Sequence, residues 1–272
     1  MPDLALLLPL LAALSLIGAF AGVVGGLLGV GGGIVLVPAF FYAFGQLGYG
    51  GDQLMQVGVA TSMATIVVTS LRSVSEHNRR GAVDWTVLKT WGPTLVIAAA
   101  VGTFVAGQVS SLTLQAVFGA LAGLAGLWMA FGRDHWRLGT AMPGQPTRSA
   151  LAAAVGLFSA MMGIGGGTFG VPLMTLYGLP IHRAVATASG FGVLIAVPSV
   201  LGFLLLPVTN APPWTIGAVN LPAFLVVIGT TLLTTPLGVR LAHSMNPRPL
   251  KRAFALFLTL VALNMLRKVL GW

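Results

Sequence analysis

The sequence has no cysteine and few charged residues. Asp, Glu, Lys and Arg make up only 7% of its 272 residues, whereas a soluble domain carries about 25%. The absence of cysteine excludes disulfides, thiol chemistry and cysteine-ligated metals. The shortage of charge excludes a water-facing surface of ordinary composition, and 56% of the residues are apolar. Because the apolar runs are much longer than barrel strands, the chain is predicted to be an all-α integral membrane protein.

Acidic residues are especially scarce: the sequence has five Asp and Glu and 14 Lys and Arg, for a net charge of +9. In a soluble protein this balance would indicate nucleic-acid binding. Here the basic residues fall in short loops between apolar runs, which is how orientation in a membrane is encoded, so nucleic acid is excluded as a partner. The acidic residues all lie at ends or in loops, which leaves no carboxylate proton relay within the spans. They are Asp3, Asp52, Glu76, Asp84 and Asp134.

Ten apolar stretches follow one another, five on each side of a polar linker. Their ranges are Leu4–Leu28, Ile34–Phe44, Met55–Val74, Thr86–Ala106, Leu114–Phe131, Ser149–Met162, Thr168–Tyr177, Ala184–Leu206, Thr215–Leu241 and Pro249–Leu270. The chain is thereby divided into a first transmembrane repeat (1–131), a cytoplasmic linker (132–148) and a second transmembrane repeat (149–272). The second stretch of each half is too short to span, because at 1.5 Å per residue it covers only about half of a 30 Å core.

A glycine block occurs once in each half. Gly29-Val30-Gly31-Gly32-Gly33 precedes Pro38, and Gly163-Ile164-Gly165-Gly166-Gly167 precedes Pro172, each residue 134 positions after its counterpart (29 to 163, 38 to 172). Adjacent glycines cost about 1 kcal/mol each in a helix interior, so both segments are predicted to be helix breaks. Further landmarks repeat in the same order, among them Ala60-Thr61 with Ala186-Thr187. The chain is interpreted as two copies of one ancestral unit.

The basic loops predict that the copies have opposite orientations. Segments 72–89 and 240–252 and the linker are rich in Lys and Arg, whereas 45–54, 107–113 and 207–215 have none. The positive-inside rule places the first group in the cytoplasm and the second outside. Loop 75–85 is basic but its counterpart 207–219 is uncharged, which predicts two inverted-topology repeats. Each repeat is expected to hold a re-entrant broken-helix hairpin and three transmembrane helices.

The breaks are the candidate binding site. Ile34 and Thr168 open short helices whose first N–H groups lack intrahelical acceptors and carry partial positive charge, so two such ends can bind an anion without a buried cation. Hydroxyls that follow each hairpin can donate to the same anion, or instead bond back to their own helix. The expected substrate-binding residues are Gly31, Gly32, Gly33, Ile34, Thr61, Ser62, Gly165, Gly166, Gly167, Thr168, Thr187 and Ser189.

Other conspicuous residues are given structural interpretations. Gly18, Gly22, Gly25, Gly26 and Gly29 have the spacing of helix-packing glycines. His182 and Arg183, at a helix entrance, serve either to attract the anion or as a positive-inside anchor. His77, His135 and His243 are interpreted as loop residues, and no residues have metal-ligand spacing.

These motifs resemble the sulfite exporter TauE/SafE family, also called the toluene sulfonate uptake permease family. The resemblance is carried by Gly22 to Pro38, Gly156 to Pro172, Ala60-Thr61-Ser62 and Gly238 to Ala242, and it spans almost the whole chain. It implies transport of sulfur oxyanions or organosulfonates across the bacterial inner membrane. Ala188 departs from the family pattern, which often has serine after the threonine, so the second hydroxyl pair is incomplete.

The sequence therefore predicts a multi-pass secondary transporter for a small sulfur-containing anion such as sulfite, thiosulfate or sulfoacetate. A passive anion channel is the alternative, because paired half-helices also build pores. An intramembrane enzyme would need a nucleophile–base pair or a metal cluster at depth, and neither is visible, so no enzyme activity and no cofactor or metal is expected. The expected partners are the anion, membrane lipids and, among assemblies, a homodimer. The exact substrate, the direction of transport and the coupling ion stay open.

Overall fold

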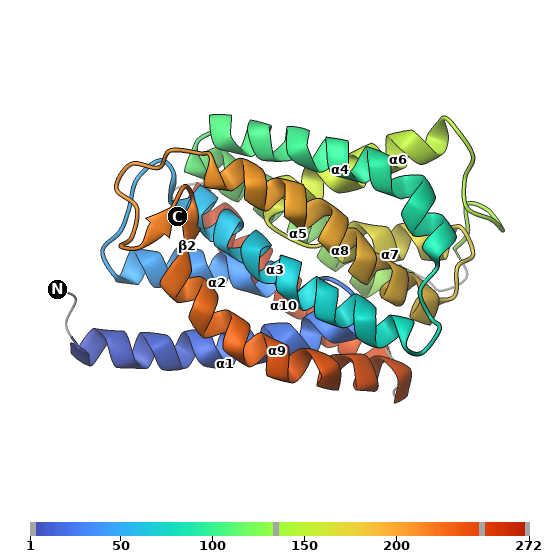
Figure 1. Cartoon of the computed structure of the whole chain (residues 1–272), viewed down its shortest axis with the longest axis horizontal. Helices are drawn as coiled ribbons and strands as arrows, with labels where there is room; N and C mark the ends of the chain where they lie inside the picture. Colours follow the sequence, from blue (N-terminus) through green and yellow to red (C-terminus); the bar gives the residue numbers. More distant parts are fainter. Residues whose placement is uncertain (1–3, 133–135, 245–247, 270–272) are drawn as a thin grey trace.

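The structure, a computed structural model, describes residues 4–132, 136–244 and 248–269. Over these residues the chain is almost entirely helical (Figure 1). The helices are α1 (Leu4–Leu28), α2 (Gly33–Gln46), α3 (Leu54–Asn78), α4 (Trp85–Gln108), α5 (Ser111–Phe131), α6 (Thr147–Met162), α7 (Gly167–Leu176), α8 (Ile181–Leu204), α9 (Leu221–Ser244) and α10 (Arg248–Val269). Two short strands, β1 (Thr215–Ile216) and β2 (Val219–Asn220), form an antiparallel pair.

The all-α prediction is confirmed. Within the described residues, six helices are long and apolar enough to cross a membrane, namely α1 from Pro9, α3, α4, α5, α8 and α9. The helices α2 and α7, with 14 and 10 residues, are too short, as expected. One boundary is wrong. Residues 215–220 were expected to begin a helix but form the β1–β2 hairpin, which turns at Gly217 with φ 57°. Glycine adopts this left-handed backbone without steric cost.

Polar side chains cap the N-termini of three helices by accepting hydrogen bonds from free amides of the first turn. Asp84 Oδ1 accepts from Thr86 N and Val87 N at the start of α4, at 3.1 and 3.2 Å. Asn220 Oδ1 accepts from Ala223 N at the start of α9, at 3.0 Å. Ser110 caps α5 in the same way. Such caps satisfy amides that have no intrahelical acceptor.

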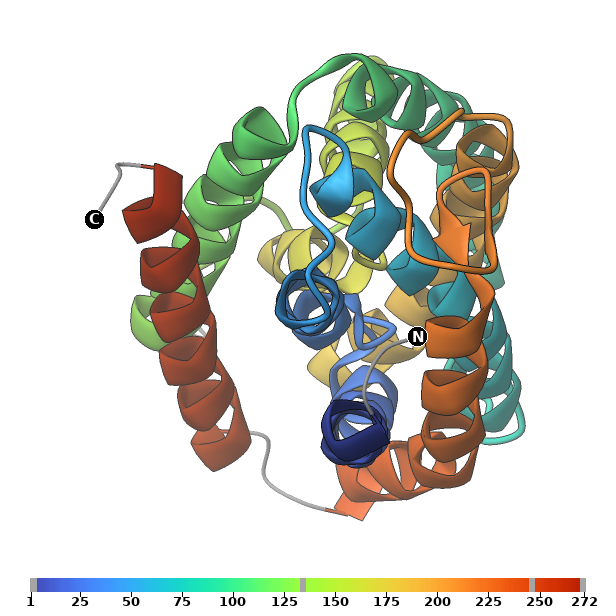
Figure 2. The ribbon, with the colours of Figure 1, turned by 90° about the vertical axis from the view of Figure 1, so that its left-hand side faces the viewer.

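The helices pack in pairs that recur across the linker. α1 packs against α9 and α6 against α4, while α2 lies on α3 and α7 on α8. α3 packs against α8 at the centre of the bundle, and α5 packs against α10 along one edge (Figure 2). Helices α1, α3, α4 and α5 of the first half therefore each pack against a helix of the second half, and the two halves share one core.

Charge separates the two ends of the bundle. The segments without Lys or Arg meet at one end, where Gln53 Nε2 donates to Pro207 O at 3.2 Å and Ser111 N donates to Asp52 O at 2.8 Å. At the opposite end, Arg183 pairs with Asp84 at 3.0 Å. Figure 1 shows the loop after α2 and the loop after α8 at the left, and the linker at the right. This is the sorting that the positive-inside rule anticipates.

Candidate functional site

The two helix breaks lie in direct contact at the junction of the two halves. The amide of Gly165 donates to the carbonyl oxygen of Val30 at 3.2 Å. A Cβ added to Gly33 would meet the Gly163 carbonyl and lie 2.9 Å from the Ile164 Cα. The two segments are 134 positions apart in sequence, and only the absence of side chains lets their backbones approach this closely.

The glycines act in two ways at this junction. Gly32, just before α2, has φ 80°, and Gly163, just after α6, has φ 69°, so both turn the chain through left-handed backbone. Gly165 has an ordinary conformation, but a Cβ there would lie 2.7 Å from Val30 O. The repeated block therefore serves chain reversal at some positions and backbone contact at others.

A short helix begins directly after each break. The first hydrogen bonds in the i to i−4 pattern are donated by Leu36 N to Gly32 O in α2, at 3.2 Å, and by Gly170 N to Gly166 O in α7, at 2.7 Å. The amides of Ile34 and Thr168 lie before these points and have no acceptor in their own helix. Both helix starts carry the partial positive charge that favours an anion.

Two hydroxyls of α3 form hydrogen bonds with backbone carbonyls of the two breaks. Ser62 Oγ donates to Gly163 O at 2.8 Å, and Thr69 Oγ1 donates to Gly31 O at 3.2 Å. The sequence analysis named Ser62 but missed Thr69. A signal was present, because buried hydroxyls recur every fourth residue on one face of α3, at Thr61, Thr65, Thr69 and Ser73.

Three predicted hydroxyls point away from the junction of the breaks. Thr61 Oγ1 donates to Val57 O and accepts from Asn220 N, at 2.7 and 3.0 Å. Thr187 Oγ1 accepts from Asp84 N at 2.9 Å, near the basic end. Ser189 Oγ contacts Ser73 Oγ at 2.9 Å. In this conformation the three hydroxyls form hydrogen bonds with backbone groups or with a side chain of another helix.

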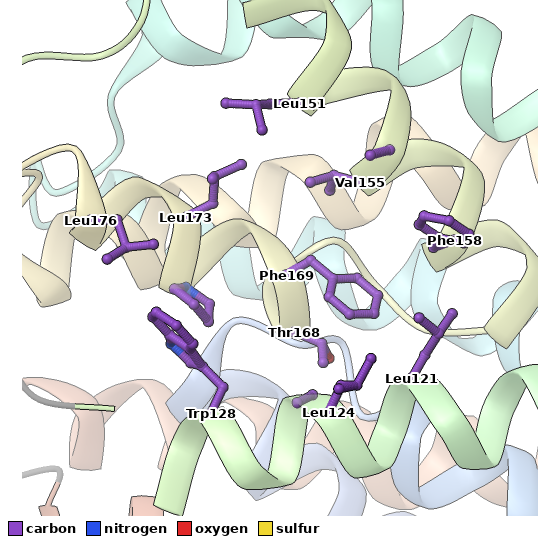
Figure 3. A pocket seen from close by; sticks show the side chains of 13 residues that line it. Leu121, Leu124, Trp128, Leu151, Val155, Phe158, Thr168, Phe169, Leu173 and Leu176 are labelled. Carbon is purple, nitrogen blue, oxygen red and sulfur yellow. The ribbon is translucent and has the colours of Figure 1, made fainter. Parts of the chain in front are cut away.

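Beside the second break lies an apolar cavity of about 380 Å³, between α5, α6 and α7 (Figure 3). Thr168, the second residue of α7, lines it. Its side chain is 5% exposed and its Oγ1 is buried without a hydrogen-bond partner. A buried, unsatisfied hydroxyl is costly and calls for an explanation. The other lining residues include Leu121, Leu124, Trp128, Phe158, Phe169 and Leu173.

The glycines of α1 before the break are packing residues, as predicted. An added Cβ at Gly22 would lie 2.8 Å from Thr231 O, and one at Gly26 would lie 3.0 Å from Val239 N. Gly18 faces Val227 and Thr230. α1 and α9 thus approach backbone to backbone, as small residues allow in membrane helices. Gly25 is different, because it faces Gly31 and Gly32 of the break.

The interpretation of two histidines as loop residues is wrong. His77 belongs to the last turn of α3 and His243 to the last turn of α9, because both helices continue beyond their apolar stretches. The two rings are hydrogen-bonded, with 3.1 Å between Nδ1 of His77 and Nε2 of His243. Among the described residues no group of three or more His, Cys, Asp or Glu is placed to hold a metal ion. His135 lies outside the described residues.

Comparison with known proteins identifies a family and two membrane proteins to which this sequence is similar. The sequence model of the family described as "Sulfite exporter TauE/SafE" matches residues 14–265. A probable membrane transporter protein of Haemophilus influenzae is 30% identical, over 93% of this chain and 97% of the relative. Another, from Methanocaldococcus jannaschii, is 25% identical, over 97% of each chain. No solved structure matches.

Proposed function

Since this chain belongs to the sulfite exporter TauE/SafE family, a family of membrane transporters, we propose that it is a secondary transporter for a small sulfur-containing anion. The multi-pass chain would lie in the bacterial inner membrane. The substrate class is sulfite, thiosulfate or an organosulfonate such as sulfoacetate. The anion would be bound by backbone N–H groups of the two glycine-rich breaks.

The unpartnered hydroxyl of Thr168 carries this proposal. It lies in the first turn of α7, where the amides of Gly167 and Thr168 have no helical acceptor and the helix dipole is positive. A sulfonate or sulfite oxygen placed there would accept from the hydroxyl and from these amides. No lysine or arginine lines the cavity. The charge would thus be held by dipoles alone, which permits release, because a full countercharge at low dielectric would bind much more tightly.

The cavity favours an organosulfonate over a bare oxyanion. Apart from Thr168, every side chain that lines it is hydrophobic, including Leu124, Phe158 and Phe169 (Figure 3). Sulfite has no apolar part to bury there, whereas the carbon chain of a sulfonate does. Binding sites of this kind combine an apolar wall with a few polar groups that fix orientation.

The two halves would be inverted repeats that move against each other. The pairing of α1 with α9 and of α6 with α4 is what a two-fold axis between the halves would produce, since it exchanges α1 with α6 and α9 with α4 and so carries one pair onto the other. Charge supports the same relation, because 75–85 lies at the basic end and 207–219 at the end whose loops have no Lys or Arg. In the described conformation the breaks touch, so access would require the halves to separate there.

A counterflow experiment tests the proposal against the channel alternative. Purified protein in proteoliposomes is loaded with unlabelled sulfite, thiosulfate or sulfoacetate, and uptake of the labelled anion is followed. A carrier gives saturable uptake that is stimulated by anion on the opposite side. Anion currents that rise linearly with voltage, without counterflow, would establish a channel instead.

A further inference from the structure

Three histidines form a chain that leads from the surface into the bundle. His182, at the start of α8, is exposed, and its ring stacks on that of His243, with centroids 5.9 Å apart and planes 20° apart. His243 Nε2 is 3.1 Å from His77 Nδ1. His77 is fully buried, and its Nε2 is 3.3 Å from the carbonyl oxygen of Gly26 in α1. The chain therefore joins four helices, α8, α9, α3 and α1.

The buried end of this chain has no carboxylate to neutralise it. Both carboxylates nearby are paired with arginine, Glu76 with Arg72 and Arg79 and Asp84 with Arg183. α1 contributes no charged residue between Leu4 and Leu28. The cations of this end come from α3 and its following turn, from the start of α8 and from the last turns of α9. They are Arg72, Arg79, Arg80, Arg183 and Arg240.

We propose that this histidine chain is the proton pathway of the transporter and that His77 binds the proton that accompanies each anion. The inference rests on the proposed transport function and adds its coupling ion. It also provides a proton-binding group where the middle of the spans has no carboxylate, because imidazole is the remaining side chain that gains and loses a proton near neutral pH.

The hydrogen bonds define how the proton moves. In the neutral chain, His77 Nε2–H donates to Gly26 O, and His77 Nδ1 accepts from His243 Nε2–H. A proton that arrives at His243 Nδ1 allows the Nε2–H bond of His243 to break while a new N–H bond forms at His77 Nδ1. His77 then carries one added proton and the positive charge, and His243 is neutral again with its hydrogen on Nδ1. No heavy atom needs to move.

Protonation of His77 would act on the first break through α1. Gly26 is three residues before Gly29, and it also sits against the backbone of Thr235 and Val239 in α9. A cation enclosed at this contact is unfavourable unless an anion or water neutralises it. An anion at the breaks supplies the opposite charge, so proton and anion favour each other's binding. This reciprocity is the requirement for symport.

The test compares two assays on the same proteoliposomes, with radiolabelled thiosulfate and sulfoacetate as probes. Counterflow needs no net proton movement, whereas accumulation driven by an alkaline interior does. Both probes carry two negative charges near neutral pH, so the membrane potential is clamped at zero. For one proton per anion, the wild type is then expected to reach about tenfold accumulation per unit of pH gradient. His77→Gln keeps a side-chain amide that can reach Gly26 O but cannot titrate. It is expected to retain counterflow with a raised KM for the anion, because the favourable charge is missing, and to lose gradient-driven accumulation.

Glu76→Gln is the matched control, because it removes a titratable group from the adjacent position of α3 and should leave coupling intact. If His77→Gln does not yield folded protein, His243→Gln decides, since it removes the middle imidazole and should slow proton uptake measured with an internal pH dye. Gradient-driven accumulation that persists in a folded variant, or a wild type that shows counterflow but no accumulation driven by a pH gradient, would overturn the histidine proposal. Absence of counterflow in the wild type with every probe would instead overturn the transport proposal itself.

Discussion

The hydroxyl oxygen of Thr61 accepts a hydrogen bond from the backbone amide of Asn220, at 3.0 Å. In the other half, Thr187 accepts from the amide of Asp84 in the same way, at 2.9 Å. Asn220 and Asp84 are the capping residues of α9 and α4. Each threonine therefore fixes the start of a helix in the opposite half, and the two contacts lie toward opposite ends of the bundle.

Thr61→Val is expected to lower stability more than substrate affinity. The change leaves the buried Asn220 amide without its acceptor, which costs about 1–3 kcal/mol. Thr103→Val is the matched control, because Thr103 is also buried but only bonds back to Ala99 O in its own helix. Thermal unfolding in detergent should show a lower midpoint for Thr61→Val alone. A large rise in the KM for the anion with unchanged stability would instead give Thr61 a substrate contact.

Thr168→Val should weaken transport with little loss of stability. The hydroxyl has no partner to lose within the protein, whereas a hydrogen bond to an anionic oxygen is worth about 1.5–3 kcal/mol, or roughly a 10- to 100-fold loss of affinity. Thr175→Val controls for the substitution in α7, because the Thr175 hydroxyl bonds to Pro172 O. Counterflow measured over a range of anion concentrations decides; equal KM values for the two variants would contradict the site.

Gly167→Ala should destabilise the protein by disturbing the contact between the breaks. The added methyl group would meet the Gly29 carbonyl, and overpacking of this kind costs about 1–3 kcal/mol. Gly229→Ala in α9 provides the comparison, because no atom lies within 4 Å of its added Cβ. We expect a lower unfolding midpoint for Gly167→Ala and an unchanged or slightly higher one for Gly229→Ala. Equal midpoints would mean that the breaks are not packed together.

Ala154→Phe should discriminate between substrates. Ala154 lines the apolar cavity, so a phenyl group there would occupy space assigned to the carbon chain of a sulfonate. Uptake of sulfoacetate should fall more than that of sulfite, which has no such chain. Ala100→Phe on α4 is the control, since Ala100 is exposed and lies outside the cavity. Equal losses for the two anions would argue against an apolar subsite.

Single cysteines can establish orientation, because the chain has none of its own. Gly50 and Gly144 each have open space around the Cβ position and no left-handed backbone, so Gly50→Cys and Gly144→Cys should fold normally. An impermeant maleimide added to intact cells should label Gly50→Cys, while Gly144→Cys should react only after the membrane is opened. Labelling of both from one side would refute the predicted orientation.

Much of the architecture was readable from hydropathy and glycine. The first apolar stretch predicted a helix at Leu4–Leu28, and α1 has these bounds in the structure. It also placed the short helices α2 and α7 within one or two residues, because glycine and proline interrupt apolar runs locally. Hydropathy and the positions of glycine and proline act between residues that are neighbours in the chain, so the sequence is sufficient to read them.

The partners of polar side chains were not readable. Thr61 and Ser62 are adjacent in sequence, yet one holds the start of α9 and the other holds the second break. His77 and His243 looked like separate loop residues, 166 positions apart, and prove to be hydrogen-bonded. Their helices extend past the apolar stretches, where hydropathy has already fallen.

Composition and periodicity thus determined that this chain is a helical membrane protein with two interrupted segments, because the cost of placing residues in hydrocarbon adds up along the chain. Only the tertiary structure determined which hydroxyl, amide and imidazole groups form hydrogen bonds with one another. Such encounters depend on how helices from different parts of the chain rotate and pack, and on the close approach that bare glycine backbone permits.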